Sequence, residues 1–228
     1  MEQNKMGVMP VNKLLISMSL PMMISMLVQA LYNIVDSMFV AQLSENALTA
    51  VSLAFPAQNL MIAVGTGTGV GVNALISRSL GEKNKERANL IANNGLMLYV
   101  ISGICFAVFG LFFSGIFFRA QTSDPEIVQL GTDYLRICCL LSTAIFLQFG
   151  FERILQATGR TFHTMLTQGL GAIINIILDP ILIFGLCGAP ALGIKGAAIA
   201  TVFGQVCAAS LACWFNKKKN DYIVINPK

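Results

Sequence analysis

The stretch NALTAVSLAFPAQNLMIAVGTGTGVGVNALIS, residues 46–77, contains 32 residues and no charged side chain. About 20 apolar residues are enough for an α-helix to cross the hydrocarbon core of a membrane. Three more charge-free stretches of similar length lie at 14–35, 88–118 and 196–216. Two shorter ones, at 137–151 and 161–178, become full spans if a few polar residues near their ends are tolerated. The pattern therefore predicts six membrane-spanning helices.

The composition leads to the same fold class. Of the 228 residues, 55% are hydrophobic and only 11% are charged, and the mean hydropathy is +0.71. A soluble domain carries roughly a quarter charged residues. Six spans use most of the chain and leave too little for a separate soluble catalytic domain, and no nucleophile–base pair is evident. We therefore expect an all-α membrane protein that is not an enzyme and binds no cofactor.

The spans are expected near 14–40, 51–78, 89–118, 127–150, 163–187 and 193–215. Together they make one six-helix transmembrane lobe over residues 14–215. Residues 1–13 are expected to form an amino-terminal tail, and residues 216–228 a carboxyl-terminal tail. The short connections between the spans contain turn-forming and helix-capping residues, as tight loops require.

The distribution of Lys and Arg predicts the orientation. Twelve of the fifteen lie in the two tails and in the second and fourth loops, and the exceptions are Arg119, Arg136 and Lys195. Because cytoplasmic segments are rich in Lys and Arg, both termini are expected to be cytoplasmic, in a multi-pass protein of the inner (plasma) membrane. The basic run at 217–219 is expected to contact anionic lipid. The net charge of +4 is then a topology signal, and no nucleic-acid partner is expected.

Two acidic residues, Asp36 and Asp179, lie well inside expected spans. A carboxylate at that depth costs about 2.5–3.5 kcal/mol even on the lenient insertion scale, so it usually serves a function. Two other acids, Asp133 and Glu152, are expected near span ends, where water reaches them.

The helical rise of 1.5 Å per residue places both buried acids in the outer half of the membrane. Asn175 precedes Asp179 by four residues and shares its helical face, and Asn33 lies one turn from Asp36. Thr201 lies roughly 12 Å below the outer end of the sixth span. Asp36, Asn175, Asp179 and Thr201 are therefore expected to converge at one level.

Carboxylate, carboxamide and hydroxyl oxygens suit a hard monovalent cation such as Na⁺, or a proton. Exchange of that ion for a cationic substrate would couple the two fluxes. The alternative is that Asp36 and Asp179 only form hydrogen bonds that join helices.

Five segments of the chain resemble the multidrug and toxic compound extrusion (MATE) transporters. They are LYNIVDSMFV (31–40), ISRSLG (76–81), LQATGR (155–160), NIILDP (175–180) and GAAIAT (196–201). The five segments occur in the family's order, and the resemblance extends over nearly the whole chain. The resemblance is closest to the bacterial and archaeal branch that has acidic residues in its first lobe.

The resemblance implies one lobe of a twelve-helix transporter that exports organic cations by alternating access, in exchange for Na⁺ or H⁺. It places the cation site at Asp36, Asn175, Asp179 and Thr201. It also implies that Gln29, Tyr32 and Gln205 face the substrate cavity, and we include Asn33 with them. Residues 216–228 would then begin the linker between the lobes.

This chain stops after its sixth span, so a second six-helix lobe is expected as a partner. It is either a missing carboxyl-terminal half or a second copy of the chain in a homodimer. Two other functions remain open: a related flippase for lipid-linked oligosaccharides, and a non-transporting membrane subunit or scaffold. The flippase would be expected to line its cavity with cations.

Overall fold

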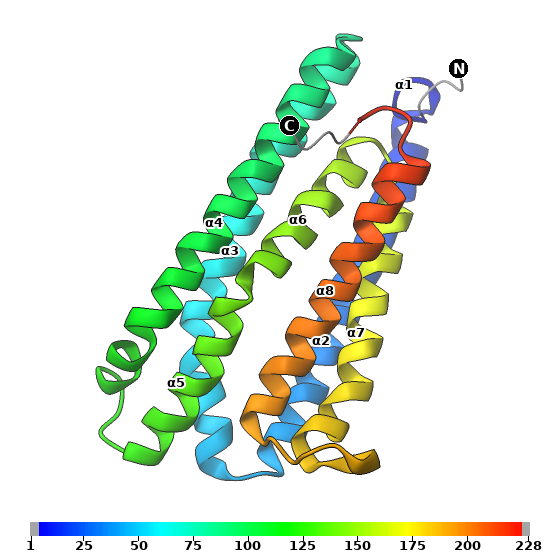
Figure 1. The fold of residues 1–228 in the computed structure, drawn as a ribbon. Helices are drawn as coiled ribbons and strands as arrows, with labels where there is room; N and C mark the ends of the chain where they lie inside the picture. The colour runs from blue at the N-terminus through cyan, green and yellow to red at the C-terminus, as the bar shows by residue number, and fades with distance from the viewer. Residues whose placement is uncertain (1–4, 225–228) are drawn as a thin grey trace.

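The computed structural model describes residues 5–224, and within this range the chain is a bundle of helices without strands (Figure 1). The elements are α1 (Lys5–Val8), α2 (Val11–Ala41), α3 (Glu45–Gly81), α4 (Lys85–Arg119), α5 (Pro125–Leu140), α6 (Ser142–Ala157), α7 (Thr161–Phe184), the 3₁₀ turn η1 (Leu186–Gly188) and α8 (Ile194–Lys219). Five helices are long and apolar enough to cross a membrane, and α5 with α6 make a sixth span if the pair is counted as one. The expected all-α membrane fold is confirmed. The outermost parts of the expected tails, residues 1–4 and 225–228, lie outside the described residues.

The fourth expected span, 127–150, is broken into two helices that meet at an angle of 46°. The break lies at Leu141, whose ψ of 13° departs from helical geometry. At this point the hydroxyl of Ser142 donates a hydrogen bond to the backbone oxygen of Gly103 on α4, at 2.9 Å. A side chain at Gly103 would lie only 2.7 Å from the Cα of Thr143, so the missing side chain lets α4 approach the bend. The bend is thus held by a neighbouring helix.

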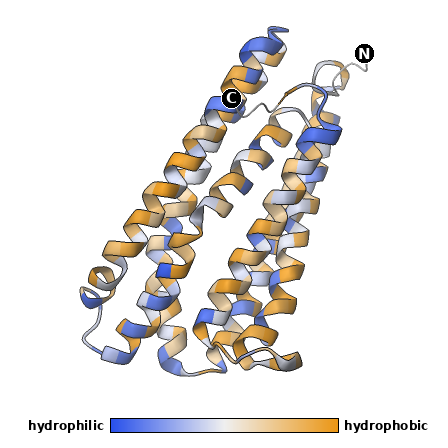
Figure 2. Ribbon diagram, viewed as in Figure 1, coloured by the Kyte–Doolittle hydropathy of each residue, from blue (hydrophilic) through white to orange (hydrophobic). Residues whose placement is uncertain are grey.

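The helices divide into two groups that meet along α8 (Figure 1). In one group α2 packs on α7, which packs on α8, and in the other α3, α4, α5 and α6 pack together. The second group meets the first mainly where α6 and α5 contact α8. Both termini lie at the same end of the bundle, which we call the terminal end (Figure 1). Hydrophobic residues cover most of the helix surfaces between the two ends, as a lipid environment requires (Figure 2).

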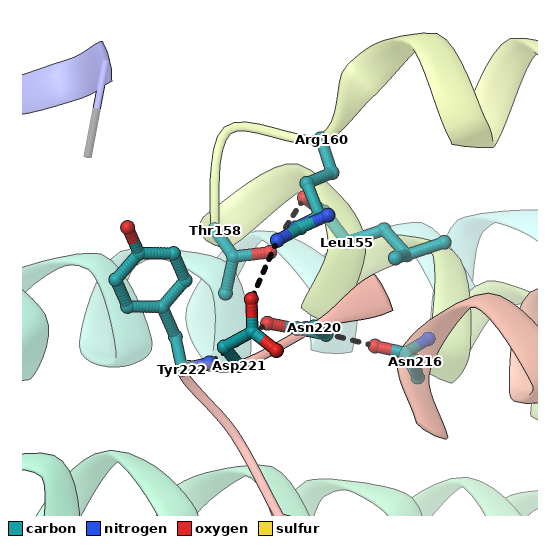
Figure 3. Close-up of polar contacts among 7 residues, drawn as sticks. All are labelled: Leu155, Thr158, Arg160, Asn216, Asn220, Asp221 and Tyr222. Carbon is teal, nitrogen blue, oxygen red and sulfur yellow. Dashed lines mark hydrogen bonds and ion pairs between the residues drawn. The ribbon is translucent and has the colours of Figure 1, made fainter. Parts of the chain in front are cut away.

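After α8, the chain turns back across the terminal end instead of leaving the bundle (Figure 1). Asn216, near the end of α8, donates hydrogen bonds to the backbone oxygens of Phe151 and Ala212, both at 2.9 Å. Asn220 then donates to the side-chain oxygen of Asn216 at 3.1 Å (Figure 3). Next to it, Asp221 pairs with Arg160 at 3.4 Å. The first turn after α8 is therefore tied to the ends of α6 and α7.

The tail segment, residues 220–224, ends against α4. Ile223 is only 2% exposed and packs in an apolar cluster with Ile76, Ala92, Ile154 and Ala157. The neighbouring Val224 then pairs with α4 through its backbone. Its N–H donates to the side-chain oxygen of Asn89 at 2.9 Å, and its carbonyl accepts from the side-chain amide of Asn93 at 3.2 Å. The tail segment thus links α8 to α3, α4 and α6 at the terminal end.

Replacing Ile223 by Ala is expected to release the tail segment. Truncating a buried Ile to Ala costs about 2–5 kcal/mol. This cost is large compared with the free energy that holds a docked segment of five residues in place. The Asp221–Arg160 pair contributes little because the Asp221 side chain is 88% exposed. Trypsin cleavage within the basic run Lys217–Lys219 should therefore accelerate by at least about tenfold. The control is Val224→Ala, because that side chain is 65% exposed, and equal cleavage of the two variants would contradict this prediction.

Candidate functional site

Three helices bring the predicted cation-site residues together: α2 carries Asp36, α7 carries Asn175 and Asp179, and α8 carries Thr201. Both acids are buried, with exposed fractions of 8% for Asp36 and 0% for Asp179. Their carboxyl groups lie close enough to act on each other electrostatically. Because two negative charges at this separation repel strongly, the pair suits one shared positive charge between its members.

Asn175 connects the pair to α8. In the amide orientation that satisfies its neighbours, its nitrogen donates to Oδ2 of Asp179 at 3.0 Å. Its oxygen then accepts from the backbone N–H of Thr201 at 3.1 Å and from the Thr201 hydroxyl at 3.2 Å. One amide therefore fixes both α7 and α8 relative to the carboxylates. The four residues that sequence and depth predict lie in one cluster.

One oxygen of this cluster is available to a ligand. Oδ1 of Asp36 is buried and has no hydrogen-bond partner among residues 5–224. A buried carboxylate oxygen without a donor is costly, so a bound cation would stabilise it. The oxygens around it belong to carboxylate, carboxamide and hydroxyl groups, which are ligands that Na⁺ accepts and that also bind a proton. The described part of the chain contains no group of three or more His, Cys, Asp or Glu side chains that could hold a metal ion.

Two glycines let α7 and α8 approach closely enough for the contact between Asn175 and Thr201. A Cβ atom on Gly204 would lie 2.7 Å from the backbone oxygen of Gly171, a distance that real Cβ atoms do not adopt. Gly204 follows Thr201 by less than one helical turn, and Gly171 precedes Asn175 by about one turn. The small residues therefore set the helix separation at the level of the site.

A cavity lies beside the cluster, and its polar wall comes from α2, α3, α5, α6, α7 and α8. All four residues expected to face the substrate line it, namely Gln29, Tyr32, Asn33 and Gln205. Asp36, Asn175 and Thr201 line it as well, whereas Asp179 lies behind the wall. Among the described lining residues none is Lys, Arg or His, so the only formal charge in the wall is that of Asp36.

Several polar residues of the cavity were not predicted. Gln58 donates to the hydroxyl of Tyr134 at 3.1 Å, and both line the cavity. Gln148 and Gln168 line it too and donate hydrogen bonds to Glu152. Uncharged amides inside apolar spans are the only sign of such residues in a sequence.

The expectation that water reaches Glu152 is wrong. This residue is only 2% exposed. The fourth span was expected to end at residue 150, but α6 continues to Ala157 and carries Glu152 inward against α7. By contrast, Asp133 does lie near the opposite end, where it pairs with Lys195 at 3.1 Å.

Comparisons with known proteins identify relatives along nearly the whole chain. The family model described as MatE matches residues 21–181. A FAD transporter of Shewanella oneidensis is 32% identical over 203 residues, which are 89% of this chain and 45% of that protein. The multidrug export protein MepA of Staphylococcus aureus is 30% identical over 220 residues, covering 96% of this chain and 48% of that protein.

Solved structures give the same result. A MOP superfamily transporter from Pyrococcus furiosus superimposes with a TM-score of 0.87 at 34% identity, covering 94% of this chain and 47% of that one. An outward-facing multidrug resistance MATE family transporter superimposes with a TM-score of 0.85 at 33% identity, with the same two coverages. The chain therefore spans about half the length of the relatives it matches.

Proposed function

Because the chain belongs to the MatE family, we propose that it is the amino-terminal lobe of a transporter that exports organic cations in exchange for Na⁺ or H⁺. Members of this family are multi-pass membrane transporters and not enzymes. The observation that supports the proposal best is the unpartnered oxygen of Asp36. It lies beside Asp179, at the edge of a cavity whose described wall contains no basic residue.

Exchange follows from repulsion between two positive charges bound in one cavity. At a separation of about 16 Å and an effective dielectric constant of about 20, two unit charges repel by about 1 kcal/mol. The coupling ion at Asp36 and a cation in the cavity would therefore weaken each other's binding about fivefold, and by linkage the effect is reciprocal. Arrival of the ion from outside then promotes release of the substrate to the outside. Asn175 and Thr201 would complete the ion's ligand shell.

The charge of the cavity also separates this proposal from its alternatives. Lipid-linked oligosaccharides and FAD, the substrate named for the Shewanella relative, both carry a pyrophosphate group. Such a group would need Lys or Arg in the cavity, and the described lining residues include neither. If the acids only joined helices in a scaffold, the buried Oδ1 of Asp36 would be expected to have a hydrogen-bond partner, and it has none among residues 5–224. The electrostatics therefore favour an organic cation.

A second lobe is required for the exchange to work by alternating access. It is either a segment that continues this polypeptide or a second copy of the chain. Two copies of a six-helix unit have the same orientation in the membrane and pair about an axis along the membrane normal, as parallel repeats do in other transporters.

Proteoliposomes test the proposal. The 228-residue chain is reconstituted, and movement of ethidium, a permanent organic cation, is followed under an imposed Na⁺ or pH gradient. We expect at least one of the gradients to drive ethidium in the opposite direction, and dissipation of that gradient by an ionophore to stop it. The molar mass in detergent, with bound detergent subtracted, shows how many lobes each particle contains.

Two outcomes would contradict parts of this proposal. Particles that contain two lobes and move no ethidium under either gradient would contradict cation exchange. A chain that is a stable monomer would exclude the homodimer and leave the two-lobe polypeptide, which is then tested in the same vesicles.

A further inference from the structure

A third buried carboxylate, which the exchange mechanism above does not use, lies behind the cavity wall. Glu152 lies on α6 and accepts three hydrogen bonds from neutral donors. Gln148 and Thr167 donate to its Oε1, both at 3.0 Å, and Gln168 donates to its Oε2 at 2.8 Å. The Thr167 hydroxyl has a single hydrogen, which it shares between Glu152 and the backbone oxygen of Thr164 at 2.8 Å. With four acceptor positions on a carboxylate, one on Oε2 stays open.

No cation within the described part of the chain pairs with Glu152. The nearest basic residue along the chain is Arg153, whose Nη1 donates to Gln156 at 2.9 Å. Its side chain lies beside Gly69, between α6 and α3. The positive charge of Arg153 acts on Glu152 from a distance, and no ion pair joins these two residues. Neutral donors and a charge that is not in contact offset only part of the cost of burying a carboxylate, so the site retains affinity for a positive charge.

The partners of Glu152 connect it to the cavity. Gln148 and Gln168 both line the cavity wall. Each donates a hydrogen bond from its amide nitrogen to Glu152, and neither amide oxygen accepts a hydrogen bond from another described residue. Each oxygen is therefore able to accept from an N–H group. The two glutamines in the wall are thus connected to a negative charge behind it.

The position of this group places it apart from the Asp36 cluster. Gln168 precedes Asn175 by seven residues and Asp179 by eleven, which puts all three on one face of α7. The rise per residue separates Gln168 from Asp179 by about 16 Å along the helix. The same wall therefore carries an acidic group near each end, with Glu152 nearer the terminal end of the bundle.

A second polar group without a partner lies near Gln168 on α7. The hydroxyl of Thr164 is buried and has no hydrogen-bond partner among residues 5–224, and the residue is 2% exposed. Thr164 lies four residues before Gln168, on the same face of α7. An additional oxygen without a donor thus lies one turn from the amide oxygens.

We propose that Glu152, with the amide oxygens of Gln148 and Gln168, forms a cation-binding site at the end of the cavity nearer the termini, and that this site takes an organic cation whose delocalised charge is shared with N–H groups. The inference rests on the proposed function, because it names where the organic cation binds. It also separates the two positive charges along the wall. The substrate occupies the Glu152 end, and the coupling ion occupies the Asp36 end.

Binding of two dyes to the purified 228-residue chain tests the site. Ethidium is the cationic probe and Nile red the neutral one, and both are followed by fluorescence without any ion gradient. We expect Glu152→Gln to weaken ethidium binding by at least about tenfold, because the negative charge is lost while the shape is kept. Nile red binding should stay unchanged. The matched control is Asp133→Asn, which neutralises a carboxylate at the opposite end and should leave both dyes unaffected.

A purely structural role for Glu152, joining α6 to α7, is distinguished by a second variant. Thr167→Val removes a donor to Glu152 without altering the described cavity wall, since Thr167 is fully buried behind it. If Glu152 binds the cation, the less compensated carboxylate should bind ethidium about two- to fivefold more tightly. If Glu152 only joins the helices, this variant lowers thermal stability and leaves ethidium affinity the same or weaker.

Each outcome decides between the claims. Ethidium affinity that is unchanged in a folded Glu152→Gln protein would overturn the Glu152 site alone. If that variant fails to fold, the direction of the change in Thr167→Val decides instead. Absence of ethidium binding to the unaltered chain would contradict both this site and the proposed organic-cation substrate. Since no gradient is applied, the result does not depend on whether Asp36 and Asp179 bind the coupling ion.

Discussion

Replacing Asp36 or Asp179 by Asn is expected to abolish ion-coupled efflux in a protein that contains both lobes. Asn keeps the size of the side chain but binds neither a proton nor a full share of a metal ion's charge. Among residues 5–224, the only other buried acid is Glu152, whose partner Gln168 lies about 16 Å along α7 from Asp179, so no nearby buried acid replaces the pair. Gradient-driven ethidium flux should therefore fall by about 100-fold or more.

The measurement compares ethidium flux at equal amounts of inserted protein. Asp133→Asn serves as the control, because Asp133 pairs with Lys195 outside the cavity wall. Ethidium binding without a gradient should survive in the Asp36 and Asp179 variants, since only coupling is removed. Full flux in both variants would show that the coupling ion binds elsewhere.

The second large effect is expected from Gly204→Val. The first atom of the new side chain would lie 2.7 Å from the backbone oxygen of Gly171. A backbone atom in a packed helix cannot move aside as a flexible side chain can, so α7 and α8 must separate. Overpacking of this kind costs about 1–3 kcal/mol or more. The hydrogen bonds between Asn175 and Thr201 should break as the helices part.

Thermal unfolding in detergent and ethidium flux measure these two consequences. The control is Gly169→Val in α7, because a Cβ atom at Gly169 has no heavy atom within 4 Å. Both substitutions add the same side chain to a helical glycine in a membrane span. We expect a clear fall in the unfolding midpoint and loss of flux only for Gly204→Val. Equal midpoints for the two variants would mean that the close approach of α7 and α8 is not needed.

The long-range placement of Asp36 and Asp179 could be predicted because it depends on few quantities. Runs without charge locate the helices, and the rise per residue then gives the depth of each acid. Neither step needs the packing of side chains. The same reasoning places Asn175 beside Asp179, since residues four apart share a helical face.

The break at Leu141 and the burial of Glu152 could not be predicted in this way. Neither Pro nor Gly marks the break, and the Ser142–Gly103 hydrogen bond joins residues far apart in the chain. Glu152 is expected near water because the charge-free stretch 137–151 ends just before it. Its actual partners come mainly from α7, and a hydrophobicity pattern carries no information about which helices become neighbours.

The docked tail segment has a mechanical consequence. Val224 lies beside α4, to which both its backbone N–H and its carbonyl are hydrogen-bonded. A pulling force applied to the chain at Val224 would act on α4 and on the apolar cluster around Ile223 before it reaches α8. Such a force would therefore displace α8, the helix that carries Thr201, only after the tail segment has detached.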